Sequence, residues 1–327
     1  MIITRTPLRA SFAGGGSDIA SFYRRFGGAV VSTAIDKYIY VTVNRKFDDG
    51  LRVAYSRNEE VENLGQIRHP IVKNALKILG ISGGVEITTI ADVPSRGTGL
   101  GSSSSFAVGL LCALGGFQGR FMAAQELAEL SCEVEIELCG EPIGKQDQYA
   151  AAYGGMSLIE FNADDTTRVT PIIMPKERRQ AVESRLLMFY TGSTRSASAL
   201  LEVQSEAVSS NLAKQNVLRS MVQLAYQLRD ELQSGAVDNL GAILHENWML
   251  KKSISSGISN PEIDYLYDRA IAAGATGGKI LGAGGGGFLL FDGPAEKHLA
   301  IEAALVPLRR VPVGFERQGC QVIFYHA

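Results

Sequence analysis

The chain has 327 residues, of which 46% are hydrophobic and 20% are charged, and its formal net charge is −2. A chain of this length can bury one large core or two moderate ones. The weak net charge does not indicate binding to nucleic acid or to an anionic membrane. The longest apolar run, near 106–117, is too short to span a bilayer. The sequence lacks an apolar leader, and its four cysteines form no C-x-x-C pair. We therefore expect a cytoplasmic globular protein.

The N-terminal residues 2–14 are predicted to be extended, with Arg9 facing either solvent or a site. Three glycines at 14–16 follow, and then Ser17 and Asp18. Glycine lets a backbone approach a ligand closely, and aspartate is a good helix N-cap. Asp18 is thus either a cap or an acceptor for the hydroxyl protons of a substrate lying on the glycines.

Several further elements are predicted before residue 91. The β-rich runs 29–35 and 38–43 are expected to be joined as a hairpin through Asp36-Lys37. Residues 70–79 are typical of a helix, and the alternating run 84–90 of a strand.

A glycine-rich loop at 94–105 is the most informative stretch of the chain. Its glycines at 97, 99 and 101 precede four serines and an apolar run that indicates a buried helix. Serine is a favoured N-cap, and free amides at the positive end of a helix suit an anion such as phosphate. A flexible turn with an ordinary cap is the alternative. No segment of the chain is a Walker loop. The nearest match runs from Gly274 to Lys279, and there the lysine is followed by isoleucine rather than by serine or threonine.

A second helix is predicted over 122–140, and its charges are unevenly distributed. At about 100° per residue, one stripe of the helix is acidic and should face solvent: Glu126, Glu129, Glu133 and Glu137. Glu135 falls nearly opposite, on a face of small and apolar residues. A carboxylate there is costly unless it is paired or binds a metal. Glu135 is therefore predicted to be functional, with a structural ion pair as the alternative.

The loop after this helix leads into a short helix that begins near Asp147, which is either its N-cap or a functional carboxylate. The polar region 160–184 suggests a domain boundary near residue 170. Beyond it, one long helix is predicted over 196–233. Further helices are predicted at 236–253 and 261–273, the first of them with Trp248 in the core. A strand, a glycine loop and a strand follow over 277–291, and the loop is expected to cover a ligand or the phosphate loop.

Three glycine-bearing segments in this order make the chain resemble the GHMP kinases. Residues 94–105 resemble the family's P-x-x-x-G-L-G-S-S motif, 6–18 its first motif and 279–288 its third. The resemblance implies an α+β fold with a ribosomal-S5-like N-terminal domain, about 1–170, and a ferredoxin-like C-terminal domain, about 171–327. The active site should lie between them. The GGGSD form of the first motif and Thr191-Gly192-x-x-Arg195 resemble the heptose 7-phosphate kinase branch.

The resemblance also implies roles for individual residues. Asp147 takes the proton of the attacking hydroxyl, and Arg9 keeps this aspartate charged and supports the transferring phosphoryl group. Ser103 and Glu135 bind Mg²⁺. The ATP-binding residues are Pro94, Arg96, Gly97, Thr98, Gly99, Leu100, Gly101, Ser102, Ser103 and Ser104. The substrate-binding residues are Gly15, Gly16, Ser17, Asp18, Lys145, Thr191, Gly192, Arg195, Lys251, Gly284 and Gly285.

These roles predict an ATP- and Mg²⁺-dependent kinase that acts on the anomeric hydroxyl of a sugar phosphate, with heptose 7-phosphate as the expected acceptor. Its product would feed surface polysaccharide synthesis. Arg195 and Lys251 would bind the distal phosphate, because a guanidinium group can bind phosphate in a bidentate manner, and Lys145 is the alternative. The alternatives are a fucokinase-like kinase of a free sugar and a non-catalytic sugar and ATP sensor. No nucleic-acid or membrane partner is expected, and the protein should be a monomer or a homodimer.

Overall fold

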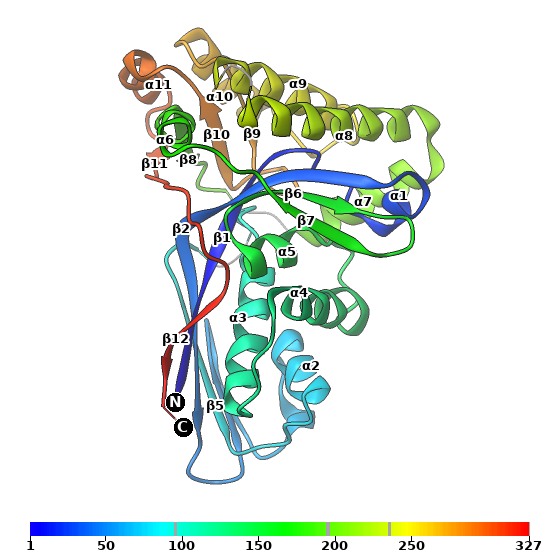
Figure 1. The fold of residues 1–327 in the computed structure, drawn as a ribbon, viewed down its shortest axis with the longest axis vertical. Helices are drawn as coiled ribbons and strands as arrows, with labels where there is room; N and C mark the ends of the chain where they lie inside the picture. Colours follow the sequence, from blue (N-terminus) through cyan, green and yellow to red (C-terminus); the bar gives the residue numbers. More distant parts are fainter. Residues whose placement is uncertain (95–96, 194–196, 235–236, 327) are drawn as a thin grey trace.

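The computed structural model describes residues 1–94, 97–193, 197–234 and 237–326. They form two antiparallel-rich sheets with their helices (Figure 1). The strands of the larger sheet are β1 (Ile2–Ala13), β2 (Gly28–Arg45), β3 (Leu51–Ala54), β4 (Asn58–Val61), β5 (Val85–Ala91), β6 (Met156–Phe161), β7 (Thr167–Pro171) and β12 (Gln321–Tyr325). The strands of the smaller sheet are β8 (Leu186–Tyr190), β9 (Gly277–Ile280), β10 (Phe288–Asp292) and β11 (Arg309–Arg310).

The long strand β2 organises the larger sheet, whose order is β12-β1-β2-β5-β3-β4. One edge of β2 pairs with β1, while its other edge pairs first with β6 and then with β5. The predicted hairpin at Asp36-Lys37 was wrong. Both β-rich runs pair with the same strand, and the register with β1 jumps from Tyr38 to Ile35, so these two residues form a bulge within one strand.

Helices cover one face of the larger sheet (Figure 1). The helices of the N-terminal half are α1 (Ala20–Phe26), α2 (Pro70–Ile78), α3 (Ser102–Phe117), α4 (Ala124–Cys132), a π-helical turn (Glu133–Leu138) and α5 (Gln146–Tyr153). The apolar helix α3 packs on β1 and β2, and most of its residues are buried. This packing places the start of α3, and the glycine loop before it, at the middle of β1.

The smaller sheet, in the order β11-β8-β10-β9, is fully antiparallel and agrees with the ferredoxin-like expectation. The remaining helices are α6 (Lys176–Ser184), α7 (Ala197–Ser210), α8 (Leu212–Gln233), α9 (Leu240–Lys252), α10 (Pro261–Ala272) and α11 (His298–Ala304). The single helix predicted over 196–233 is two helices, because Asn211 caps α8 by accepting from the amides of Ala213 and Lys214. Trp248 is fully buried, as predicted.

Strands from both ends of the chain meet in the larger sheet. β12 pairs antiparallel with β1, with Tyr325 opposite Ile2, and Figure 1 shows the two chain ends side by side. The sheet of the N-terminal half therefore takes its edge strand from residues 321–325.

Candidate active site

A cavity of about 700 Å³ lies where the glycine loop, β1 and the smaller sheet meet. Charged groups from both halves of the chain line it, namely Arg9, Asp18, Glu135, Glu141, Asp147 and Lys251. These residues are separated by up to 242 positions in the sequence, so only the packing of the two sheets brings them together.

The glycine loop is held by the third glycine-rich segment. Gly97, Gly99 and Gly101 have φ of 66°, 74° and 76°, a left-handed conformation that favours glycine. A Cβ atom on Gly99 would lie 2.2 Å from the carbonyl oxygen of Leu281, and one on Gly287 would lie 2.4 Å from that of Thr98. Of the two alternatives predicted for the β9–β10 loop, a ligand or the glycine loop at 97–101, the structure shows contact with the glycine loop.

The serines after the loop do not cap α3, contrary to the prediction. The N-cap is Gly101, and its left-handed backbone places the four serines inside the first turn. Ser105 donates to the carbonyl of Pro7 at 2.8 Å, which ties α3 to β1. The hydroxyls of Thr98 and Ser102 lie 3.3 Å apart, and Ser103 turns toward Glu135. The amides at the start of α3 stay available to an anion.

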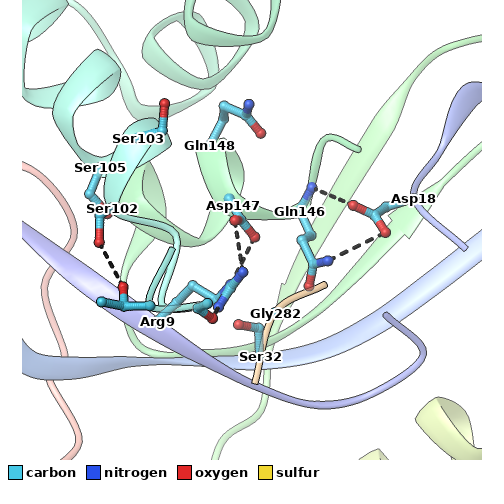
Figure 2. Close-up of polar contacts among 12 residues, drawn as sticks. Arg9, Asp18, Ser32, Ser102, Ser103, Ser105, Gln146, Asp147, Gln148 and Gly282 are labelled. Atoms are coloured by element: carbon cyan, nitrogen blue, oxygen red, sulfur yellow. Dashed lines mark hydrogen bonds and ion pairs between the residues drawn. The ribbon is translucent and has the colours of Figure 1, made fainter. Parts of the chain in front are cut away.

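Arg9 and Asp147 form a two-bond ion pair at the floor of the cavity (Figure 2). Nε of Arg9 donates to Oδ1 of Asp147 at 2.8 Å, and Nη2 donates to Oδ2 at 2.7 Å. A third guanidinium nitrogen, Nη1, donates to the carbonyl of Gly99. Lys145 is the N-cap of α5, so Asp147 stands in the first helical turn with its side chain in the cavity rather than serving as a cap. Arg9 thus fixes both the carboxylate and the glycine loop.

Glu135 is fully buried, as the helical pattern predicts. It lies in the π-helical turn that continues α4, and it accepts from Ser103 Oγ at 2.6 Å and from Gln148 Nε2 at 2.7 Å. Burial raises the pKa of this carboxyl to about 7. No ion pair to Glu135 exists within the part of the chain that the structure describes, so its charge is uncompensated there.

This arrangement fits the divalent cation that the fold implies. The described residues contain no group of three His, Cys, Asp or Glu side chains that could hold a metal by themselves. A magnesium ion commonly takes one or two protein ligands, and phosphate oxygens and water complete its shell. Ser103 and Glu135 supply a hydroxyl and a carboxylate beside the cavity.

Asp18 lies at the opposite side of the cavity and is 3% exposed. It does not cap α1, whose N-cap is Ile19. Instead it accepts from the amide of Gly16 at 2.9 Å and from the amide of Gln146 at 3.2 Å. Burial is the main cause that raises the pKa of Asp18, and Asp147 nearby adds to the effect. A Cβ atom at Gly144 would lie 1.9 Å from Oδ2 of Asp18.

The predicted substrate lysines have different surroundings. Lys251 is buried, lines the cavity and donates to the carbonyl of Gly282 at 2.6 Å. Burial lowers its pKa to about 8. Lys145 instead donates to the carbonyl of Asp165 and lies over the Tyr23 ring, outside the lining of the cavity.

The other predicted substrate residues are mostly held by the protein itself. Ser17 exchanges hydrogen bonds with the backbone of Ala29, and Thr191 donates to the carbonyl of Gly287. Gly15, Gly192, Gly284 and Gly285 do not line the cavity, and neither do Pro94 and Leu100 of the predicted ATP set. Gly285 donates its amide to Ile258. Arg96 and Arg195 lie outside the described residues.

Sequence reasoning missed a group of amide and hydroxyl residues in the cavity. Gln146, Ser198 and Gln204 all line it, and Gln148 supports Glu135 from behind. Gln146 and Gln148 flank Asp147, and this spacing around a candidate base was the one available signal. Ser198 and Gln204 belong to α7, whose weak amphipathic pattern gave none.

A second cavity of about 790 Å³ shares Ser102, Ser103 and Glu141 with the first. Its walls combine apolar and aromatic side chains, among them Ile39, Tyr55, His69 and Phe106. Such a pocket suits a flat, partly apolar group that is joined to phosphates on the glycine loop.

Comparison with known proteins decides the family. The GHMP kinases N terminal domain model matches residues 69–155, and the GHMP kinases C terminal model matches residues 228–305. The chain is also 33% identical over 319 residues to a D-glycero-alpha-D-manno-heptose 7-phosphate kinase of Campylobacter jejuni, covering 92% of each protein. The chain belongs to the GHMP kinases.

Other relatives agree with a GHMP sugar kinase. The chain is 28% identical over 322 residues to an L-fucokinase/L-fucose-1-P guanylyltransferase of Bacteroides fragilis, of which it covers 34%. A D-glycero-D-manno-heptose 1-phosphate kinase from Bacteroides thetaiotaomicron superposes over all of both chains with a TM-score of 0.82 and 25% identity. A putative sugar kinase from C. jejuni gives 0.79 and 30% over 98% of this chain and 97% of the other.

The family confirms the predicted fold and the predicted class of enzyme, a sugar kinase that transfers phosphate to an alcohol group. GHMP kinases use ATP, so ATP is the implied phosphate donor. No helix among the described residues is long and apolar enough to cross a membrane.

Proposed function

We propose that this GHMP kinase phosphorylates the C1 hydroxyl of D-glycero-D-manno-heptose 7-phosphate to give the 1,7-bisphosphate. The observation that carries the proposal is the 33% identity, over 92% of both chains, to a heptose 7-phosphate kinase. The pair of Arg9 and Asp147 inside a cavity with a phosphate loop supports a phosphoryl transfer to a hydroxyl group.

ATP would place its triphosphate on the glycine loop and its base in the second cavity, because the two cavities share Ser102 and Ser103. The free amides at the start of α3 would receive the phosphates. Ser103 and Glu135 would hold Mg²⁺, which neutralises charge on the phosphates when it is bound.

Asp147 would accept the proton of the sugar hydroxyl through a carboxylate lone pair that Arg9 leaves free. The hydroxyl oxygen bonds to the γ-phosphorus of ATP as the bond from that phosphorus to the ADP oxygen breaks. Arg9 holds Asp147 and the glycine loop together, so the base and the phosphate site keep a fixed separation. Positioning and charge neutralisation are the main contributions a protein makes to this reaction.

The distal phosphate of the sugar requires a cation away from the reacting hydroxyl. Arg195 and Lys251 remain our candidates, and Lys145 is the weaker one because it is engaged by Asp165. The product would serve nucleotide-activated heptose for surface polysaccharide, in the cytoplasm, with the kinase as a monomer or a homodimer.

The alternative is a fucokinase-like reaction on a free sugar, which the similarity to the L-fucokinase favours. Turnover of ATP with Mg²⁺ should be measured against heptose 7-phosphate, mannose 6-phosphate, fucose and galactose. Turnover confined to heptose 7-phosphate, with phosphate transferred to C1 by NMR, supports the proposal. Turnover of fucose alone would replace it with the alternative. ATP binding without any turnover would favour a sensor.

A further inference from the structure

One wall of the first cavity is formed by α7. Ser198, Leu201 and Gln204 line the cavity at a spacing of three, which places them along one side of the helix. Gln204 is only 1% exposed. Its Nε2 is buried, and within the described residues it has no hydrogen-bond partner.

A complementary atom belongs to Gln146, at the start of α5. Nε2 of Gln146 points to Oδ1 of Asp18 at 3.4 Å, an orientation that Figure 2 shows and that attraction between an amide donor and a carboxylate explains. The amide oxygen, Oε1, is therefore turned away from Asp18. It too is buried without a partner in the described part of the chain.

Two amide atoms without hydrogen-bond partners in one cavity lower the stability of the protein when no ligand is bound. A buried polar atom without a partner has lost its hydrogen bonds to water and gained none from the protein. Native proteins satisfy nearly all such atoms, so two of them in one cavity call for an explanation, and a bound molecule that completes the hydrogen bonds is one. Gln204 offers a donor and Gln146 an acceptor, and both line the same cavity as Asp18.

A hydroxyl group matches this set, because it both donates and accepts. Phosphate oxygens only accept, so they would leave Oε1 of Gln146 unsatisfied and would be repelled by the Asp18 carboxylate. We propose that Gln204 and Gln146 recognise the ring hydroxyls of the acceptor sugar and set its specificity together with Asp18. The assignment to a sugar rests on the proposed function.

The first glycine motif is shaped by the same contact. A Cβ atom on Gly16 would lie 2.4 Å from Nε2 of Gln204, so glycine at this position lets α7 bring the amide into the cavity. The amide of Gly16 in turn holds Oδ1 of Asp18 at 2.9 Å. The motif and α7 therefore form one site, although 188 positions separate Gly16 from Gln204.

The test compares Gln204→Met and Gln146→Met with Glu202→Gln, a matched change at an exposed position of α7. KM and kcat for heptose 7-phosphate and for its monodeoxy analogues are measured with saturating ATP, and KM for ATP is measured separately. We expect Gln204→Met to raise the KM for the sugar about tenfold, the loss of one or two hydrogen bonds. KM for ATP should change less than twofold, and Glu202→Gln should match the wild type.

Two further readouts separate recognition from a structural role. The monodeoxy sugar that lacks the recognised hydroxyl should be a poorer substrate than heptose 7-phosphate for the wild type. Gln204→Met should use both sugars equally well, because this variant has already lost the hydrogen bond to that hydroxyl. The melting temperature without sugar should be unchanged or higher in Gln204→Met, because methionine removes an unsatisfied donor. An unchanged sugar KM in both variants, or a clear loss of stability without sugar, would overturn the inference.

Failure of the proposed function gives a different result. If the wild type turned over fucose and not heptose 7-phosphate, the substrate would be wrong. Kinetics of the same variants with fucose and its deoxy analogues would then decide whether Gln204 and Gln146 form hydrogen bonds with the sugar hydroxyls.

Discussion

The backbone of Gly282 packs directly on the backbone of Gly99, so closely that a Cβ atom on Gly282 would lie 2.4 Å from the Cα of Gly99. Gly282 also has a φ of 76° and accepts a hydrogen bond from Lys251 at 2.6 Å. The third glycine-rich segment therefore sets the position of the phosphate loop.

We expect Gly282→Ala to displace the phosphate loop, because neither backbone can give way without moving its strand. KM for ATP should rise at least tenfold and stability should fall by about 2–4 kcal/mol, measured by steady-state kinetics and urea unfolding. Gly80→Ala is the control. Gly80 has a φ of 67° but nothing within 4 Å of a Cβ atom, so it should lose only about 1–2 kcal/mol with KM unchanged. Equal effects of the two changes would contradict the expectation.

Replacing Asp147 by asparagine should abolish the proton acceptor while leaving the shape of the site. We expect kcat to fall by about 10²–10⁴, the usual effect of losing a general base. ATP binding, measured by calorimetry, should persist because Asp147 does not belong to the phosphate loop. Asp48→Asn, which breaks an exposed ion pair with Lys46, should keep full activity. Full turnover by Asp147→Asn would show that another residue is the base.

Glu135 should make the metal-free protein less stable as pH rises. Its pKa is raised from 4.5 to about 7 on folding, so the folded state binds the proton more tightly than the unfolded state does. The stability that this difference contributes is present below about pH 4.5 and is lost by about pH 7. Relative to Glu135→Gln, the wild type should lose roughly 2–3 kcal/mol between pH 5 and pH 8.

Urea unfolding of both proteins in the presence of a chelator measures this difference. Added Mg²⁺ and ATP should restore the wild type at pH 8 but have a smaller effect on Glu135→Gln, which should also need more Mg²⁺ for half-maximal activity. Parallel pH profiles for the two proteins would rule out an uncompensated carboxylate.

Lys251→Met should separate activity from stability. Burial lowers the lysine pKa from 10.5 to about 8, so the charged form is unfavourable in the fold at neutral pH. Its destabilising effect is present below about pH 8 and disappears as pH rises to about 10.5. We expect the methionine variant to be at least as stable at pH 7 and to lose kcat/KM at least tenfold.

The choice of acceptor then shows what Lys251 binds. If it binds the distal phosphate, the loss should appear in KM for heptose 7-phosphate and be absent with an unphosphorylated heptose. If it supports the transferring phosphoryl group, kcat should fall with either acceptor. Full activity of Lys251→Met would exclude both roles.

The sequence alone predicted those parts of the site that local patterns determine. The glycine loop was visible from three alternating glycines before an apolar helix, and Glu135 from its place on the buried face of a helix. Contacts across the two sheets were not predictable in this way. Nothing local shows that Gly282 touches Gly99 or that Gln204 of α7 reaches Gly16.

The errors of element prediction have physical reasons of the same kind. Asp36-Lys37 resembles a turn, but the pairing of both flanking runs with β1 makes it a bulge. Ser102 resembles an N-cap, but the left-handed Gly101 starts the helix one residue earlier. Tertiary pairing in the first case, and a glycine conformation in the second, outweighed local preference.

The pairing of β12 with β1 affects the order in which the protein can fold. Because β12 follows every other strand of this sheet in the chain, β1, the strand that carries Arg9, keeps an open edge until residues 321–325 have been synthesised. Contacts this distant in sequence form slowly, and an unpaired edge can associate with other chains in the meantime. Removing β12 should therefore yield an aggregating protein, and Arg9 becomes fully supported only after residues 321–325 have paired with β1.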